Sequence, residues 1–163
     1  AAVGVSHDAL EPLQYVFSDG RRRFGVLTDL GSYDATLLDS YQGLDALLIE
    51  ANHCRDMLGR GHYPMFLKQR VGGDYGHLNN HQAARLVSEL GWQNLQHLVL
   101  AHLSSKNNLP HLARQCFVDG VVDDLEHHVV QTGAVMDVAD VHAGPLADRL
   151  QAFQGGNAVG VEK

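Results

Sequence analysis

The chain has 163 residues, 45% of them hydrophobic, which is enough to bury the core of one globular domain. Its formal net charge of -7 argues against a general nucleic-acid-binding surface, and two cysteines are too few for a disulfide framework. We expect Cys54 and Cys116 to be free thiols. No stretch approaches the roughly 18 apolar residues of a membrane span, so we expect a cytoplasmic protein without a membrane partner.

The apolar pattern predicts a β-hairpin followed by alternating helices and strands. The hairpin turns at Asp19-Gly20, because these residues tolerate the positive φ of a tight turn. In chain order the predicted elements are strands over 13–18 and 23–28, a short helix after Asp34 or Ser32, a buried strand over 45–50, a loop-and-helix stretch over 51–80, a helix over 80–90, a strand over 96–101, a helix after Asn107 or Asn108, and a strand over 135–141. This order indicates a layered α/β domain over residues 1–154, with a glycine-rich tail over 155–163.

Three potential metal ligands stand at the ends of strand-like apolar runs. They are His7, Asp29 and His102, each at or just beyond the last residue of its run. Imidazole and carboxylate groups hold catalytic zinc, manganese and iron, and ligands on neighbouring strand ends can converge on one ion. The pattern therefore predicts a metallohydrolase, or part of one.

Other catalytic motifs give no competing assignment. The sequence has no His-Glu-x-x-His, no Gly-x-Ser-x-Gly and no Gly-x-x-x-x-Gly-Lys-Ser/Thr, which excludes serine-hydrolase and P-loop functions. Most of the eleven histidines lack a partnering motif, and we expect ordinary surface or packing roles for them. These are His62, His81, His97, His111, His127, His128 and His142.

Six motifs occur in a fixed order along residues 3–117. They are Ser6-His7-Asp8-Ala9 with Glu11-Pro12, Thr28-Asp29, Glu50-Ala51-Asn52-His53, Tyr63-Pro64 with Leu67-Lys68, Gly76-His77-Leu78-Asn79-Asn80, and Ala101-His102-Leu103-Ser104 with Asn107-Asn108. In order and spacing they resemble the YycJ/WalJ-type branch of the metallo-β-lactamase-fold hydrolases. The resemblance implies an α/β fold, the C-terminal portion of an αββα sandwich, and a cytoplasmic bacterial phosphodiesterase of exonuclease type.

The resemblance also implies a metal centre. His7 matches the family's third-motif histidine, Asp29 the aspartate that bridges two metals, and His102 the fifth-motif histidine of the second metal. Two divalent ions, Zn2+ or Mn2+, are expected in the complete enzyme, roughly 3.5–4 Å apart, so that a shared hydroxide can attack phosphorus. Asp29 is thus both a metal ligand and a catalytic residue.

Substrate-side residues follow from the same resemblance. His77 is expected to bind the substrate phosphate or to protonate the leaving group, although capping of the following helix is an alternative role. Asn80 and Lys106 are expected to contact substrate. His53 either orients a metal ligand or has a purely structural role.

One feature of the family is missing from the sequence. The resemblance implies a preceding half-domain with a His-x-His-x-Asp-His motif, which this chain does not contain. Three ligands do not complete a dinuclear centre, so we expect the chain to be the C-terminal part of a longer enzyme, inactive without its N-terminal half. Supply of that half by another chain, or a degenerate product without activity, are the alternatives. By itself, the chain should leave one apolar sheet face without its partner.

The leading prediction is a metal-dependent phosphodiesterase or exonuclease acting on nucleic acid. A substrate groove lined by basic residues would favour this substrate, and the candidates are Arg21, Arg22, Arg23, Lys68 and Lys106. A small-molecule phosphodiesterase or lactonase of the same fold is the competing enzyme. The non-enzymatic alternative is a domain that self-associates through its exposed sheet face.

Overall fold

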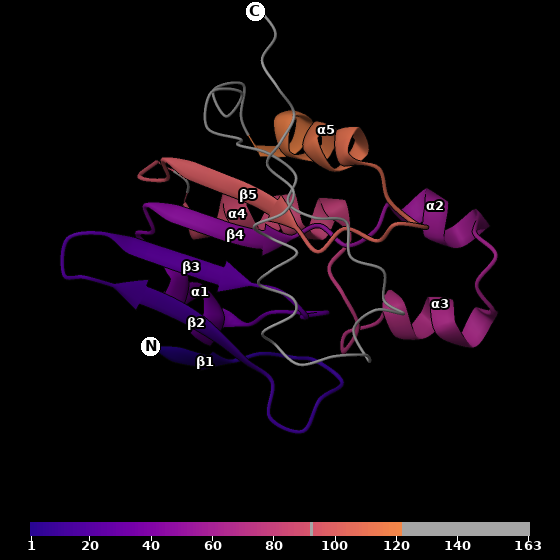
Figure 1. The fold of residues 1–163 in the computed structure, drawn as a ribbon, viewed down its shortest axis with the longest axis horizontal. Coiled ribbons are helices and arrows are strands. Elements are labelled where there is room, and N and C mark those ends of the chain that lie inside the picture. Colours follow the sequence, from indigo (N-terminus) through magenta and orange to yellow (C-terminus); the bar gives the residue numbers. More distant parts are fainter. Residues whose placement is uncertain (92, 122–163) are drawn as a thin grey trace, which may run out of the picture.

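The computed structural model describes residues 1–91 and 93–121, so the predicted strand over 135–141, the predicted tail and the predicted domain boundary lie outside the described residues. A five-stranded sheet forms the centre of the fold (Figure 1). Its strands are β1 (Ala2–Gly4), β2 (Leu13–Ser18), β3 (Arg23–Leu27), β4 (Ala46–Glu50) and β5 (His97–Ala101). The helices are α1 (Ala35–Tyr41), α2 (Arg55–Arg60), α3 (Met65–Val71), α4 (Asn80–Leu90) and α5 (Pro110–Val121). No helix in this part of the chain is long and apolar enough to cross a membrane.

The sheet combines an antiparallel half with a parallel half. Its strand order is β1-β2-β3-β4-β5, with β1, β2 and β3 antiparallel and β3, β4 and β5 parallel. The predicted hairpin between β2 and β3 is confirmed. Gly20 has a φ of 87°, and the Asp19 carboxylate accepts hydrogen bonds from the backbone N–H groups of Arg21 and Arg22 at 2.8 and 2.7 Å. The turn is thus stabilised by the residue types that predicted it.

Helix starts follow the capping pattern of the sequence. The Asp34 side chain, not that of Ser32, caps α1 by accepting a hydrogen bond from the Leu37 N–H. Helix α4 begins with a reciprocal capping box between Asn79 and Gln82, and its bounds are the predicted ones. Both helices have an apolar stripe at helical spacing, and these stripes provide the surface that covers the sheet.

One face of the sheet is covered and the other is exposed. Helices α1 and α4 lie behind the sheet in the view of Figure 1, and the strand side chains on that side are buried against them. The opposite face presents Leu13, Tyr15, Phe17 and Phe24, which are 45%, 46%, 54% and 38% exposed. The expected apolar sheet face without a partner is therefore confirmed within the described residues.

The parallel half determines where loops converge. Leu27 pairs with Ile49 across β3 and β4, and Glu50 pairs with Ala101 across β4 and β5. The three strands consequently end at the same edge of the sheet, with α2 and α3 beyond it (Figure 1). The residues that follow β3 and β5 are Asp29 and His102, two of the predicted metal ligands.

Candidate metal centre

Asp29 and His102 have the same unusual backbone conformation. Their φ values are 55° and 54°, and they are the two non-glycine residues with positive φ in the described chain. Left-handed backbone is unfavourable for a side-chain-bearing residue and persists where surrounding contacts hold it. Asn52 provides one such contact, because its buried side chain donates a hydrogen bond of 3.0 Å to the His102 carbonyl. The sharp turn after each strand directs both side chains to one point above the sheet edge.

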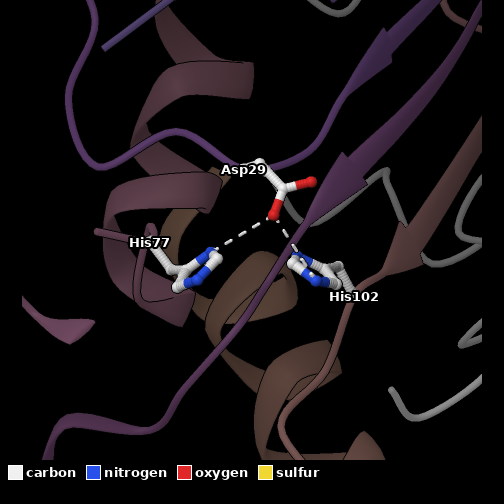
Figure 2. Close-up of side chains that lie close together, drawn as sticks. All are labelled: Asp29, His77 and His102. Carbon is white, nitrogen blue, oxygen red and sulfur yellow. Dashed lines mark ion pairs between the residues drawn. The ribbon is translucent and has the colours of Figure 1, made fainter. Parts of the chain in front are cut away.

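Three histidines surround the Asp29 carboxylate. The Asp29 Oδ1 atom lies 3.7 Å from His102 Nε2, 3.9 Å from His7 Nε2 and 4.0 Å from His77 Nδ1. Figure 2 shows His77 and His102 on either side of Asp29. Ligand atoms of Asp29, His77 and His102 all lie within 4.8 Å of one another. The histidine rings also contact each other, with centroids of His7 and His77 at 5.2 Å and of His77 and His102 at 5.1 Å.

This donor set fits a divalent metal ion. The separations of 3.7–4.0 Å exceed a hydrogen bond, whereas two ligands each about 2.0–2.2 Å from one zinc ion lie within about 4.4 Å of each other. Nitrogen and carboxylate ligands suit zinc and manganese. The Asp29 side chain is 35% exposed, so the group is partly open to solvent.

Glu50, the last residue of β4, lies beneath this group and is fully buried. Its Oε2 atom accepts hydrogen bonds from His77 Nδ1, His102 Nδ1 and the Asp29 N–H at 3.1, 3.0 and 3.0 Å. Its Oε1 atom accepts from the N–H groups of Leu30 and Leu78 at 3.3 and 2.8 Å. One carboxylate therefore joins the three loops that carry the candidate ligands.

These contacts keep Glu50 charged. Burial by itself would raise the pKa of its carboxyl, but the hydrogen bonds from His102 and His77 and the proximity of their rings lower it to about 2. An ionised carboxylate only accepts hydrogen bonds, so both Nδ1 atoms carry protons. In the neutral rings the basic nitrogen is then Nε2, and for His102 this is the atom that faces Asp29. Glu50 thus selects in His102 the tautomer that a metal requires, whereas in His77 it protonates Nδ1, the atom 4.0 Å from Asp29 Oδ1, and leaves Nε2 as the basic nitrogen.

Sequence reasoning did not identify Glu50 as a site residue. The available signal was a single carboxylate at the end of the buried run Ala46–Glu50, where an unpaired charge would be very costly. Such a residue must have several hydrogen-bond donors around it. The sequence cannot show which donors those are, because they come from loops about 20 and 50 residues away.

The loop before α4 positions the remaining two histidines. His7 Nδ1 lies 3.0 Å from the Gly76 carbonyl oxygen, and the Asp8 N–H donates to the Tyr75 carbonyl at 3.0 Å. Gly76 packs so closely against α3 that an added Cβ would collide with the backbone of Arg70. Glycine is therefore required there for steric reasons, and the close packing brings His77 to Asp29.

The structure assigns different surroundings to the predicted substrate residues. Asn80 is only 1% exposed, and its amide exchanges hydrogen bonds with Asn108 at 3.0 and 2.8 Å. The prediction that Asn80 contacts substrate is thus not supported, because its polar atoms are occupied inside the fold. Lys106 is exposed in the turn that follows β5. His77 lies with the candidate metal ligands, closer to Asp29 than the sequence indicated.

The remaining basic residues and His53 are also located. The hairpin arginines lie at the far end of β3 from Asp29, where Arg22 pairs with Asp45 at 2.7 Å, so they do not line a groove at this centre. Lys68 donates to the Gly59 carbonyl and joins α3 to α2. His53 is buried, which lowers its pKa to about 4 through loss of hydration, and its Nδ1 has no hydrogen-bond partner among the described residues.

The chain is similar to known proteins in fold and in sequence. The fold resembles the metallo-β-lactamase fold protein YhfI from Bacillus subtilis with a TM-score of 0.56 and 20% identity, over 80% of this chain and 44% of that chain. The sequence is 39% identical over 111 residues to exodeoxyribonuclease YycJ of Bacillus anthracis. It is 37% identical over 116 residues to exodeoxyribonuclease WalJ of Streptococcus pneumoniae serotype 2 (strain D39 / NCTC 7466). The chain is thus similar in sequence to the YycJ/WalJ-type exodeoxyribonucleases and in fold to a metallo-β-lactamase fold protein.

The match to the YycJ/WalJ branch is partial in length. It covers 68% and 71% of this chain but only 42% and 43% of the two relatives, so the chain spans less than half of their length. No protein-family model matches the chain. All of the candidate ligands, from His7 to His102, lie in the described part of the chain.

Proposed function

We propose that this chain is part of a metal-dependent phosphodiesterase that degrades nucleic acid as an exonuclease. The observation that carries the proposal is the group of Asp29, His77 and His102 around the buried Glu50 carboxylate. The names of the relatives, both exodeoxyribonucleases, support DNA as the substrate. The Asp29 side chain is 35% exposed and is therefore accessible to a phosphodiester.

We propose that His7, Asp29 and His102 hold two divalent ions, Zn2+ or Mn2+, in the complete enzyme. When bound, the ions would activate water and offset charge on the attacking and leaving oxygens of the phosphodiester. The chain's own contribution is orientation. The Glu50 carboxylate holds His102 as the Nδ1–H tautomer, and the Gly76 carbonyl orients the His7 ring.

His77 has a second proposed role, on the substrate side. Its Nδ1 is engaged by Glu50 at 3.1 Å, so a proton on Nε2 can be taken up or released without loss of that hydrogen bond. We expect it to bind the substrate phosphate or to protonate the leaving group. His77→Ala in the active enzyme should then lower kcat by about 10²–10⁴-fold with metal content preserved. Loss of metal in this variant would make His77 a ligand instead.

We further propose that a second half-domain, which is not part of this sequence, completes the metal centre. The exposed apolar face with Tyr15, Phe17 and Phe24 needs a covering layer, and the relatives have more than twice the length of the matched segment. A covering half-domain would bring the remaining metal ligands. The chain by itself should then bind zinc weakly and below two ions per chain. Two tightly held ions, measured by elemental analysis after gel filtration, would contradict this part of the proposal.

A self-associating domain is the second candidate, because the same exposed face would suit a second copy. Light scattering coupled to gel filtration distinguishes the two. A dimer that buries this face, and that separates when Phe17 is replaced by Glu, supports self-association. A monomer that acquires activity when a complementing half-domain is present supports the covering half-domain.

Asp29→Ala tests the metal centre directly. Asp29 is the carboxylate of the group and should be required for both metal binding and hydrolysis of bis(p-nitrophenyl) phosphate by the active enzyme. The matched control is His111→Ala, which removes an exposed histidine on α5. Equal losses in the two variants would refute the assignment, because the effect would then depend on histidine or charge content and not on position.

A further inference from the structure

A hollow of about 410 Å3 lies directly beside the candidate metal centre. Its lining includes His7, Asp8, Gln69, Arg70 and Tyr75, contributed by the segment after β1, by the end of α3 and by the loop before α4. His7 belongs to both regions, since its Nε2 is 3.9 Å from Asp29 Oδ1. A polymeric substrate whose scissile phosphate is bound next to Asp29 would therefore extend into or past this hollow.

The walls of the hollow are held in place by hydrogen bonds between distant segments. The Asp8 N–H donates to the Tyr75 carbonyl at 3.0 Å, and Ser32 Oγ donates to the Asp74 carbonyl at 3.0 Å. His7 Nδ1 lies 3.0 Å from the Gly76 carbonyl oxygen. The loop that presents the Tyr75 ring is thus tied to two other loops of the centre, so that the ring is presented without a large ordering cost.

The side chains of this hollow suit a nucleotide. Tyr75 is 68% exposed although its backbone is fixed, which leaves an aromatic face available to solvent. Arg70 is 63% exposed and pairs with Asp8 Oδ2 at 2.7 Å. This ion pair uses part of the guanidinium, and its remaining N–H donors can bind a phosphate. Exposed aromatic rings next to cationic groups bind single-stranded nucleic acid by stacking with bases and by contacts to phosphates.

We propose that this hollow is a nucleotide subsite of the nuclease. Tyr75 stacks on the base of a nucleotide next to the scissile phosphate, and Arg70 contacts a phosphate of the same strand. The inference rests on the proposed function, because it takes single-stranded DNA as the substrate. It assigns the recognition of substrate to Arg70 and Tyr75 in place of the hairpin arginines, which lie at the opposite end of β3.

The test is equilibrium binding of fluorescein-labelled oligothymidylate of about ten nucleotides to the chain in EDTA, followed by fluorescence anisotropy at several salt concentrations. Arg70→Ala should weaken binding and reduce the slope of log K against log salt by about 0.7, the value for one phosphate contact on a single strand. Tyr75→Ala should weaken binding by about five- to a hundredfold without a change in slope. Its effect should disappear on an abasic oligonucleotide of equal length.

Controls on the same molecule separate these effects from general charge or aromatic content. Arg85→Ala removes an exposed arginine that pairs with Glu89 on α4, and Phe66→Ala removes a ring on α3 that is 71% exposed. Both should bind like the parent chain. Equal effects of Arg70→Ala and Arg85→Ala, an unchanged affinity in Tyr75→Ala, or no binding by the parent chain would overturn the subsite.

Failure of the proposed function gives a different result. Hydrolysis of bis(p-nitrophenyl) phosphate needs no base-binding subsite and reports on the metal centre alone. An active enzyme with unaffected DNA binding in both variants rejects only the subsite. DNA binding that depends on Arg70 and Tyr75, together with no hydrolysis by the complete protein, retains the subsite and rejects the nuclease.

Discussion

Replacement of Glu50 by Gln should break hydrogen bonds that hold the three loops of the candidate metal centre together, while it preserves the volume of the side chain. If the amide oxygen takes the place of Oε1, the hydrogen bonds from the N–H groups of Leu30 and Leu78 remain. The NH2 group then takes the place of Oε2 and faces the three donors that bonded to it, namely the Asp29 N–H and the Nδ1 atoms of His77 and His102. The Asp29 N–H then has no acceptor, which costs about 1–3 kcal/mol. Two retained bonds lose the charge of the acceptor, at about 1 kcal/mol each. We expect a total destabilisation of about 3–5 kcal/mol.

The same substitution should reverse the tautomers of His77 and His102. Each ring can accept a hydrogen bond from the new NH2 group only if its proton moves from Nδ1 to Nε2. The nitrogen of His102 that faces Asp29 is then protonated and does not bind a metal. Affinity for zinc should fall by about 10- to 100-fold, as for other residues that orient metal ligands.

Urea unfolding followed by circular dichroism measures the first effect, and competition with a chromophoric zinc chelator measures the second. The matched control is Glu89→Gln, which removes the charge from a solvent-exposed pair with Arg85 and should change stability far less than Glu50→Gln. If Glu50→Gln unfolds at the same urea concentration as Glu89→Gln and binds zinc equally well, the proposed role of Glu50 is wrong.

The remaining predictions concern pH and close packing. The pKa of His53 is lowered from 6.5 to about 4 in the folded state, so the unfolded chain takes up the proton first as the pH falls. Stability is then fully present above pH 6.5 and decreases by about 3 kcal/mol as the pH falls towards 4. His53→Phe should remove this pH dependence in urea unfolding of the metal-free chain. Gly31→Ala should lower stability by about 1–3 kcal/mol, because an added Cβ would collide with backbone of the facing loop. The control Gly59→Ala has open space at its Cβ and should not lower the melting temperature.

Most of the order of strands and helices was predictable from the sequence alone, although β1 was not among the predicted strands and α2 and α3 were expected only as one loop-and-helix stretch. Alternating apolar residues marked β2 and β3, helical spacing marked α4 with its observed bounds, and Asp19-Gly20 marked the turn between β2 and β3. These are local signals, carried by residues within a few positions of each other. The positions of Asp29 and His102 at strand ends were predictable for the same reason, since a strand end is a local feature.

Only the tertiary structure decided which side chains meet at those strand ends. Glu50 became the centre of the group because three loops far apart in sequence each direct a donor to it, and no local pattern encodes that convergence. Asn80 lies in a family motif that suggested substrate contact, but in the folded chain its side chain is buried and hydrogen-bonded to Asn108. Which side chains become buried, paired or exposed depends on partners brought together by folding, and the sequence by itself determined the elements but not those partners.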